Sequence, residues 1–145
     1  MIVVADSWPL HYLILLEHVD LRRRFYGQVL LPEAVAGELS AAGAPGVVRE
    51  WITKPPPWVD VRPIPPAAVA TITDDLDLGE RAAIALAETV HADLLLIDEA
   101  AGRAEAKRRH LRVMGTLGVL AYQRGARSHC KRSRISRQNS ARTTV

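Results

Sequence analysis

The sequence contains a single cysteine, Cys130, so no disulfide can form within its 145 residues. A chain without disulfides suits a reducing compartment, and we expect a cytoplasmic protein. Long apolar runs are also missing: the longest candidate, LHYLILLEHV, is interrupted by His11, Glu17 and His18 and falls short of the ~18 residues that a membrane span needs. The first residues do not resemble a signal peptide, because no basic segment precedes an apolar core. We therefore expect no membrane association.

Acidic residues are absent from the last part of the chain. Seven of the 19 lysines and arginines lie after Tyr122, in a segment without Asp or Glu, so residues 1–122 carry 12 basic and 16 acidic side chains. The basic pI of about 9.4 is therefore a property of residues 123–145 and does not indicate a basic groove elsewhere. A segment with charges of one sign is expected to be disordered by itself. Two roles stay open for it: a solvated end without a specific role, or an arm that contacts nucleic acid.

Several catalytic motifs are missing as well. The sequence has no Gly-rich phosphate loop followed by lysine, no G-x-S-x-G turn, and no Cys or His spacing of a zinc site. The five histidines are scattered along the chain. These absences argue against a P-loop nucleotide hydrolase, a serine hydrolase of the α/β type and a zinc-dependent enzyme.

Short apolar runs alternate with segments of helical periodicity. Strands are predicted at Ile2–Ala5, Gln28–Leu31, Val59–Arg62, Leu94–Ile97 and Leu111–Met114. Helices are predicted at Pro9–His18, Pro32–Ala41, Val47–Ile52, Gly79–Val90, Ala100–Arg109 and Leu117–Tyr122, with Pro9 and Pro32 at first helical positions. Strands that are apolar throughout, each followed by a helix, are typical of a parallel sheet covered on both faces. We predict one α/β domain over residues 1–122, with the strand in the proline-rich KPPPWVDVRPIPP at a sheet edge.

Two of the predicted strands end directly on a carboxylate, Asp6 and Asp98. Parallel α/β sheets gather their chemistry at the carboxyl ends of the strands, so both side chains would project from one sheet edge. Glu80 stands in the first turn of its helix, where it could form a capping box with Asp77, and it also shares the inward apolar stripe. Glu38 lies beside the apolar stripe of its own helix. The alternatives are helix caps for the two aspartates and for Glu80, and a surface position for Glu38.

Four carboxylates in one cleft would repel each other and raise each other's pKa unless a cation neutralised them. Hard oxygen ligands without a His or Cys cluster favour Mg²⁺ or Mn²⁺ over zinc. The usual chemistry of such a site is phosphodiester hydrolysis, in which the metal activates a water and stabilises the charge that develops on the phosphate. The acids therefore indicate a metal-dependent nuclease.

The segments VVADSWPL, LPEAVAGEL, LDLGERAAIALA and LLLIDEAAGRAEAKRRHLRVMGTLGVL, in this order over residues 1–122, resemble the PIN domain. More specifically, they are similar to the branch of short prokaryotic proteins grouped with VapC-type toxins. The resemblance implies a three-layer α/β/α sandwich with a central, mainly parallel sheet. It also implies an Mg²⁺- or Mn²⁺-dependent endoribonuclease that hydrolyses RNA phosphodiester bonds, a toxin restrained by a small antitoxin protein, and a homodimer.

The resemblance also assigns roles to individual acids. The four catalytic positions of the family correspond to Asp6, Glu38, Glu80 and Asp98. Of these, Asp6, Asp98 and Glu80 would hold the metal. We call the four acids together the acidic cup. Glu38 would complete it by contacting the metal directly or through a water.

Three further residues receive supporting roles from the resemblance. Ser7, a small hydroxyl residue after the first acid, could hydrogen-bond a carboxylate or a water. Glu99 could assist or partly replace Asp98, and Arg103 could contact phosphate. Trp8 departs from the family, which carries a small residue there; its indole could narrow the site or offer a surface on which a base stacks. The end of the chain departs as well, because the last helix of the family normally continues there.

Two other functions stay open at this point. A PIN-like module with weak or lost nuclease activity could serve as a binding or regulatory partner. The four acids argue against complete loss, whereas Trp8 and the unusual end of the chain favour this alternative. A receiver-type phosphoacceptor domain also gathers acids at strand ends. It would need a consecutive acidic pair after the first strand and a late-strand lysine, but Asp6 stands alone and LRVMG has no lysine.

Overall fold

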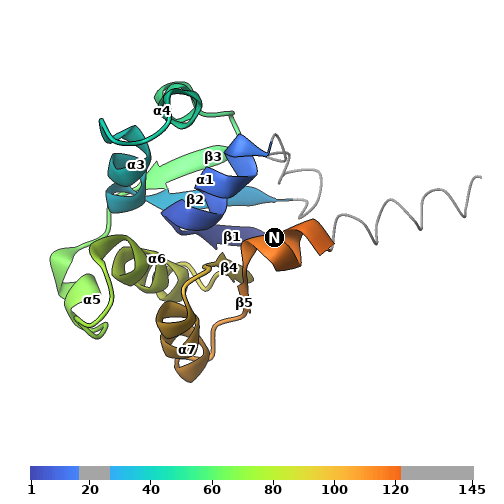
Figure 1. Ribbon diagram of the computed structural model, residues 1–145. Helices are drawn as coiled ribbons and strands as arrows, with labels where there is room; N and C mark the ends of the chain where they lie inside the picture. Colours follow the sequence, from blue (N-terminus) through green and yellow to red (C-terminus); the bar gives the residue numbers. More distant parts are fainter. Residues whose placement is uncertain (17–26, 122–145) are drawn as a thin grey trace, which may run out of the picture.

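The computed structural model of the chain describes residues 1–16 and 27–121 (Figure 1). Five strands form one parallel sheet in the order β3-β2-β1-β4-β5. The strands are β1 (Ile2–Ala5), β2 (Gln28–Pro32), β3 (Val59–Arg62), β4 (Leu94–Leu96) and β5 (Val113–Met114). The helices are α1 (Ser7–Leu15), α3 (Glu33–Ser40), α4 (Gly46–Thr53), α5 (Pro66–Ala70), α6 (Leu78–Thr89) and α7 (Ala100–Arg108), and residues 116–121 are also helical.

The sheet forms the middle layer of an α/β/α sandwich, as predicted (Figure 1). Successive residues of a strand point to opposite faces, which explains why the buried strands are apolar throughout. On one face, Val3 and Ala5 pack with α1, α3, α4 and the helical residue Val119. On the other face, Val4 packs with α6, α7 and Ile72. The two hydrophobic cores therefore leave only the ends of the strands for polar groups.

β1 lies at the centre of the sheet, between β2 and β4. Val4 of β1 pairs with Leu95 of β4. Just beyond the paired residues, the Asp6 backbone N–H donates to the Leu96 carbonyl oxygen (2.9 Å). The carboxyl ends of these two strands, followed by Asp6 and Asp98, therefore meet at one edge of the sheet.

The predicted strands and helices within the described residues are confirmed, with ends that shift by a few residues. The predictions that Pro9 and Pro32 are first helical residues are wrong. α1 begins at Ser7, and Pro32 is the N-cap of α3. At both positions the backbone N–H would have no partner within the helix, so the proline ring removes no helical hydrogen bond.

Two other differences concern connecting segments. The helix α5 is not predicted, because its sequence lies in a proline-rich stretch that is typical of a loop; Pro66 instead starts the helix, a position that suits its fixed φ. β5 begins at Val113 rather than Leu111, because His110 adopts a left-handed φ of 63° after α7 and the chain turns there. The predicted edge position of Val59–Arg62 is confirmed by the strand order.

Among the described residues, no helix is both long enough and apolar enough to cross a membrane. Two predicted helix ends, at His18 and Tyr122, lie outside the described residues. The basic segment 123–145, which contains Cys130, also lies outside them.

An arginine cluster joins the end of α7 to its neighbours. Arg109 donates to Glu105 (2.8 Å), to Glu88 on α6 (2.8 Å) and to the backbone carbonyl of Thr71, just after α5. Arg108 donates two further bonds to Glu105 (2.9 and 2.6 Å). The hydrogen bonds from Arg108 and Arg109 lower the pKa of Glu105 to about 2. Arg109 thus links α5, α6 and α7 on one face of the sheet.

Replacing Arg109 with alanine is expected to lower the thermal unfolding midpoint more than replacing Arg108, whose side chain is 67% exposed. Glu105 has a lowered pKa in the folded protein, so it stabilises the fold above its unfolded pKa of 4.5, and this stabilisation is lost as the pH falls toward about 2. The difference between wild type and Arg109→Ala should shrink over the same range. Circular dichroism melts at a series of pH values measure both effects; equal midpoints for the two variants would contradict the linking role.

Candidate active site

Asp6 follows β1 and is almost completely buried, with 1% of its surface exposed. Both carboxylate oxygens are buried, and neither has a hydrogen-bond partner among the described residues. Asp6 is the residue before α1, yet its side chain does not cap that helix. A helix cap therefore does not explain this residue. A buried carboxylate without partners is costly, which points to a ligand that compensates its charge.

The electrostatic surroundings of Asp6 are acidic. Its pKa is raised from 3.8 to about 7, chiefly by burial, with further increases from the carboxylates of Asp77, Glu38 and Glu80. The backbone N–H of Ser7 lies near enough to offset part of the rise, although it does not reach hydrogen-bond geometry with either oxygen. The fold therefore brings acids from the α3 and α6 segments to the end of β1. A bound cation would favour the charged form of each of these carboxylates and would therefore lower the pKa values that burial and mutual repulsion raise.

Glu80 is both a helix cap and a buried acid. Its backbone N–H donates to Asp77 Oδ1 (2.9 Å), and the Asp77 N–H donates to Glu80 Oε2 (3.2 Å), so the predicted capping box is confirmed. The other oxygen, Oε1, is buried without a partner in the described part of the chain. A methyl group on Gly102 of α7 would lie 3.2 Å from it. Burial and then the charges of Asp77, Glu99 and Glu38 raise the pKa of Glu80. One oxygen caps α6, and the other is left for a ligand.

Glu38 is exposed on α3, but its carboxylate is held in place. The Ser7 hydroxyl donates to Glu38 Oε2 (2.5 Å), which is the first of the two interactions expected for this serine. The carboxylate also lies against Gly79 in the first turn of α6, where a methyl group would overlap with it. Glu38 is therefore positioned by α1 on one side and by α6 on the other.

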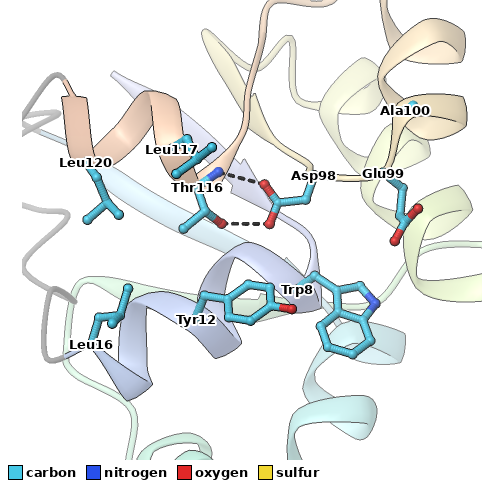
Figure 2. A pocket seen from close by; sticks show the side chains of 9 residues that line it. All are labelled: Trp8, Tyr12, Leu16, Asp98, Glu99, Ala100, Thr116, Leu117 and Leu120. Atoms are coloured by element: carbon cyan, nitrogen blue, oxygen red, sulfur yellow. Dashed lines mark hydrogen bonds between the residues drawn. The ribbon is translucent and has the colours of Figure 1, made fainter.

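Asp98 is oriented by a later helix (Figure 2). Its Oδ1 accepts from the Thr116 N–H (2.7 Å), and its Oδ2 accepts from the Thr116 hydroxyl (2.6 Å). A methyl group on Gly115 would lie 2.9 Å from Oδ1. Asp98 does not cap the helix that follows it in sequence, because the N-cap of α7 is Glu99. The cap alternative is therefore wrong for this aspartate, whose carboxylate instead binds Thr116 at the start of the helical residues 116–121.

Trp8 lines two grooves. The smaller groove has a volume of about 390 Å³ and is lined on its acidic side by Ser7 and Glu38. The larger groove has a volume of about 610 Å³ and is lined by Asp98 and Glu99, among others (Figure 2). Of the four predicted catalytic acids, Glu38 thus borders the smaller groove and Asp98 the larger one.

Glu99 lines the larger groove at the N-cap of α7, and Arg103 lies in the first turn of that helix. Glu99 is exposed, and it is close enough to Glu80 to raise the pKa of that residue. Arg103 is partly buried beside Asp98, since a methyl group on Gly115 would lie 3.8 Å from Arg103 Nη1. A phosphate contact by Arg103 stays a prediction, and this position is compatible with it.

The structure brings Asp6, Glu38 and Glu80 within electrostatic reach of one another. Asp98 is bonded within the larger groove instead. Over the described residues, no three His, Cys, Asp or Glu side chains form a ready-made metal cluster. The donors nevertheless fit a hard divalent cation: Asp6 offers two buried oxygens without partners in the described chain, Glu80 offers one, and carboxylate oxygens are the ligands that Mg²⁺ and Mn²⁺ prefer.

Three contributions to the site are not predicted from the sequence. Asp77, expected only as a helix cap, also raises the pKa of Asp6 and of Glu80. Thr116 lies in the GTLGVL segment, where nothing indicates that it bonds an acid on another strand. Gly79 is detectable in principle, because glycine in the first turn of an otherwise alanine-rich helix is unfavourable unless space is needed there.

The fold and the acidic cluster define an α/β/α sandwich protein with a carboxylate site at the carboxyl edge of its sheet. A family model described as a PIN domain matches residues 2–131. The chain therefore belongs to the PIN domain family. PIN domains are generally nucleases, so the protein falls within a family of nuclease-type hydrolases. No curated protein matches the sequence.

Proposed function

We propose that the protein is an Mg²⁺- or Mn²⁺-dependent endoribonuclease of the VapC-type branch that hydrolyses RNA phosphodiester bonds. The observation that carries the proposal is the Asp6 carboxylate, which is buried without a hydrogen-bond partner among the described residues and lies beside Glu38 and Glu80. Such an arrangement lowers stability, so a positively charged ligand is the natural explanation for it. Membership of the PIN family supports nuclease chemistry.

In the proposed mechanism, Asp6, Glu80 and Asp98 would hold the metal, and Glu38 would complete the acidic cup through the metal or a water. When bound, the divalent ion supplies an activated water and stabilises charge on the phosphate. The remaining work is positioning by the chain itself. The Ser7 hydroxyl fixes the Glu38 carboxylate, so that it stays directed toward α6.

Two further residues act on the α7 side of the site. Thr116 fixes both oxygens of Asp98. Arg103 places a guanidinium beside the same acid. An acidic cup repels the RNA backbone, so a cationic group at its rim supplies the attraction that brings a phosphate close.

We further propose that the protein is a cytoplasmic toxin that forms a homodimer and is restrained by a small antitoxin protein. The similarity of its four acid-bearing segments to VapC-type proteins supports the toxin role. A short gene upstream of this one would encode the candidate antitoxin if its protein product has a DNA-binding N-terminal segment. Growth arrest on expression of the chain, relieved by co-expression of that gene, tests the pairing.

Cleavage of labelled RNA tests the nuclease itself. Wild type is expected to cleave with Mn²⁺ and to lose cleavage completely in EDTA. Glu38→Gln should reduce the rate by about 10- to 100-fold, the usual effect of removing a supporting group at a metal site. Glu50→Gln is the matched control, because it changes an exposed glutamate on the next helix, α4. Cleavage that persists in EDTA, or equal rates for the two variants, would refute the acidic-site mechanism.

Replacing Thr116 with valine should reduce cleavage by about 10-fold, because the hydroxyl bond to Asp98 Oδ2 is lost while the backbone N–H bond to Oδ1 stays. Thr116→Ser keeps a hydroxyl and should retain most of the activity. Initial rates at saturating Mn²⁺ measure the effect. If the serine variant is as slow as the valine variant, the hydroxyl does not orient Asp98.

Two observations favour a second function, a PIN-like binding or regulatory module with weak or lost nuclease activity. Both oxygens of Asp98 are engaged by Thr116, and the described residues contain no ready-made metal cluster. Wild-type protein that binds RNA but cleaves none with Mg²⁺ or Mn²⁺ would establish this function instead.

A further inference from the structure

Two aromatic rings stand on the exposed face of α1. The buried face of this helix carries Leu10, Leu13 and Ile14, whereas Trp8 and Tyr12 are 43% and 45% exposed. They are four residues apart, so their side chains are neighbours on the helix surface. Their ring centroids lie 5.9 Å apart with an interplanar angle of 28°, a stacked arrangement. The rings therefore form a small aromatic platform that contributes little to the core.

A pair of indole rings elsewhere in the described chain behaves differently. Trp51 and Trp58 pack edge to face, with centroids 6.4 Å apart, and both contact the hydrophobic core. That pair has an ordinary structural role. The Trp8–Tyr12 platform has no such role, and an exposed indole beside a candidate active site needs another explanation.

The platform forms one wall of the larger groove. Figure 2 shows Trp8 and Tyr12 along α1, with Asp98 and Glu99 on the facing side. The volume of about 610 Å³ lies within the ~300–1,000 Å³ that small-molecule sites usually have. Asp98, one of the proposed metal ligands, lines this groove opposite the platform, so an RNA chain with a phosphate at Asp98 would have a neighbouring base within reach of the two rings.

We propose that Trp8 and Tyr12 form a stacking subsite for one unpaired base of a single-stranded RNA, next to the phosphate bound at the acids. The inference rests on the proposed function and adds a recognition element to it. Bases are planar and stack on aromatic rings whatever their sequence, whereas bases inside a duplex are not accessible to such a platform. The subsite therefore selects single-stranded over double-stranded RNA without reading the sequence.

Binding in EDTA tests the subsite independently of metal-dependent chemistry. The probe is a short fluorescein-labelled oligouridylate, compared with an RNA duplex of equal length, and fluorescence anisotropy gives the dissociation constants. Trp8→Ala should weaken binding of the oligouridylate by about 5- to 100-fold, the range expected for the loss of one stacked base. Trp8→Phe keeps a ring and should bind within about 3-fold of wild type. Leu15→Ala is the control, because Leu15 is an exposed apolar residue of the same helix that does not line the groove.

A second readout separates stacking from a general structural effect. A base that stacks on Trp8 quenches the emission of that indole, so oligouridylate should quench wild type and Trp51→Phe but not Trp8→Phe. In cleavage assays, Trp8→Ala should raise KM while kcat changes little, and the melting temperature should stay the same.

The outcomes are separable from those of the nuclease proposal. Wild-type protein that binds RNA through Trp8 but cleaves none would support the stacking subsite and refute the nuclease proposal. Normal cleavage by Trp8→Ala with an unchanged KM would refute the stacking subsite and support the nuclease proposal. Equal weakening by Leu15→Ala, or equal weakening for the duplex, would overturn base stacking. If Trp8→Ala instead changes the molar mass in solution and leaves RNA binding intact, the groove is a protein interface and the proposal is wrong.

Discussion

Asp6→Asn is expected to abolish RNA cleavage and, at the same time, to stabilise the metal-free protein above about pH 7. The loss of activity should be at least about 100-fold, because even partners outside the ligand shell of a metal site are worth 10- to 100-fold. The gain in stability follows from the buried position of the carboxylate, which has no compensating partner among the described residues. Activity and stability should therefore change in opposite directions.

The sign of the stability effect follows from the two pKa values of Asp6, 3.8 in the unfolded chain and about 7 in the folded protein. Between these values the folded state retains a proton that the unfolded state has released, so stability falls as the pH rises. With about 1.36 kcal/mol for each pH unit, the full penalty is on the order of 4 kcal/mol. A buried asparagine amide has a desolvation cost of its own, so the net gain should be about 1–3 kcal/mol.

Thermal melts of both proteins from pH 4 to pH 9 in EDTA measure this effect. The stability difference should grow from about pH 4 and level off above about pH 7. Added Mg²⁺ or Mn²⁺ should stabilise wild type, since a ligand that binds only the folded state raises its stability, and should not stabilise Asp6→Asn. A variant less stable than wild type at every pH would show that the Asp6 carboxylate has a structural partner.

Gly79→Ala is expected to reduce cleavage by about 10- to 100-fold with little loss of stability. A methyl group at this position overlaps with the Glu38 carboxylate. The carboxylate is the end of a flexible, exposed side chain, so it can move away at little cost and break its bond to Ser7. The fold should accept the change, whereas the acidic cup should lose one member.

Gly37→Ala is the matched control for this substitution. Gly37 lies within α3, one residue before Glu38, and no atom lies close to where its methyl group would be. Alanine there should stabilise the helix by about 0.5–1 kcal/mol and leave cleavage unchanged. Chemical denaturation and initial cleavage rates on both variants provide the comparison. If Gly79→Ala unfolds the protein, or if it cleaves as fast as wild type, the positioning of Glu38 by Gly79 is refuted.

The fold is largely readable from the sequence because its strands are short, apolar throughout and followed by amphipathic helices. Leu94–Leu96 and the central strand Ile2–Ala5 could be placed in a parallel sheet on that basis alone. The helix α5 escapes prediction because proline is typical both of loops and of first helical turns, and local sequence does not separate the two. The left-handed turn at His110 is not predicted, because glycine rather than histidine is the residue usually found in this backbone conformation.

The site is only partly readable, for a different reason. Strand ends place Asp6 and Asp98 at one edge, and the apolar stripe of α6 turns Glu80 inward; burial in the structure agrees for Asp6 and Glu80. Hydrogen-bond partners depend on which side chains meet across elements, and this is tertiary information. The bond between Thr116 and Asp98 links residues of separate segments, and the closeness of Gly79 to Glu38 links α6 with α3. No local pattern encodes either contact.

The pairing of β1 with β4 also determines when the acidic site can form during synthesis. Asp6 is translated early, but β4, which pairs with the strand that precedes Asp6, is translated only after all of the elements from α3 to α6. Parallel pairing over such a distance must close a long stretch of chain first and is correspondingly slow. A nascent chain that stops short of Leu94–Leu96 therefore carries its first acid with β2 beside it but without β4. The carboxyl edge that carries Asp6 and Asp98 is therefore complete only after β4 and Asp98 have been translated.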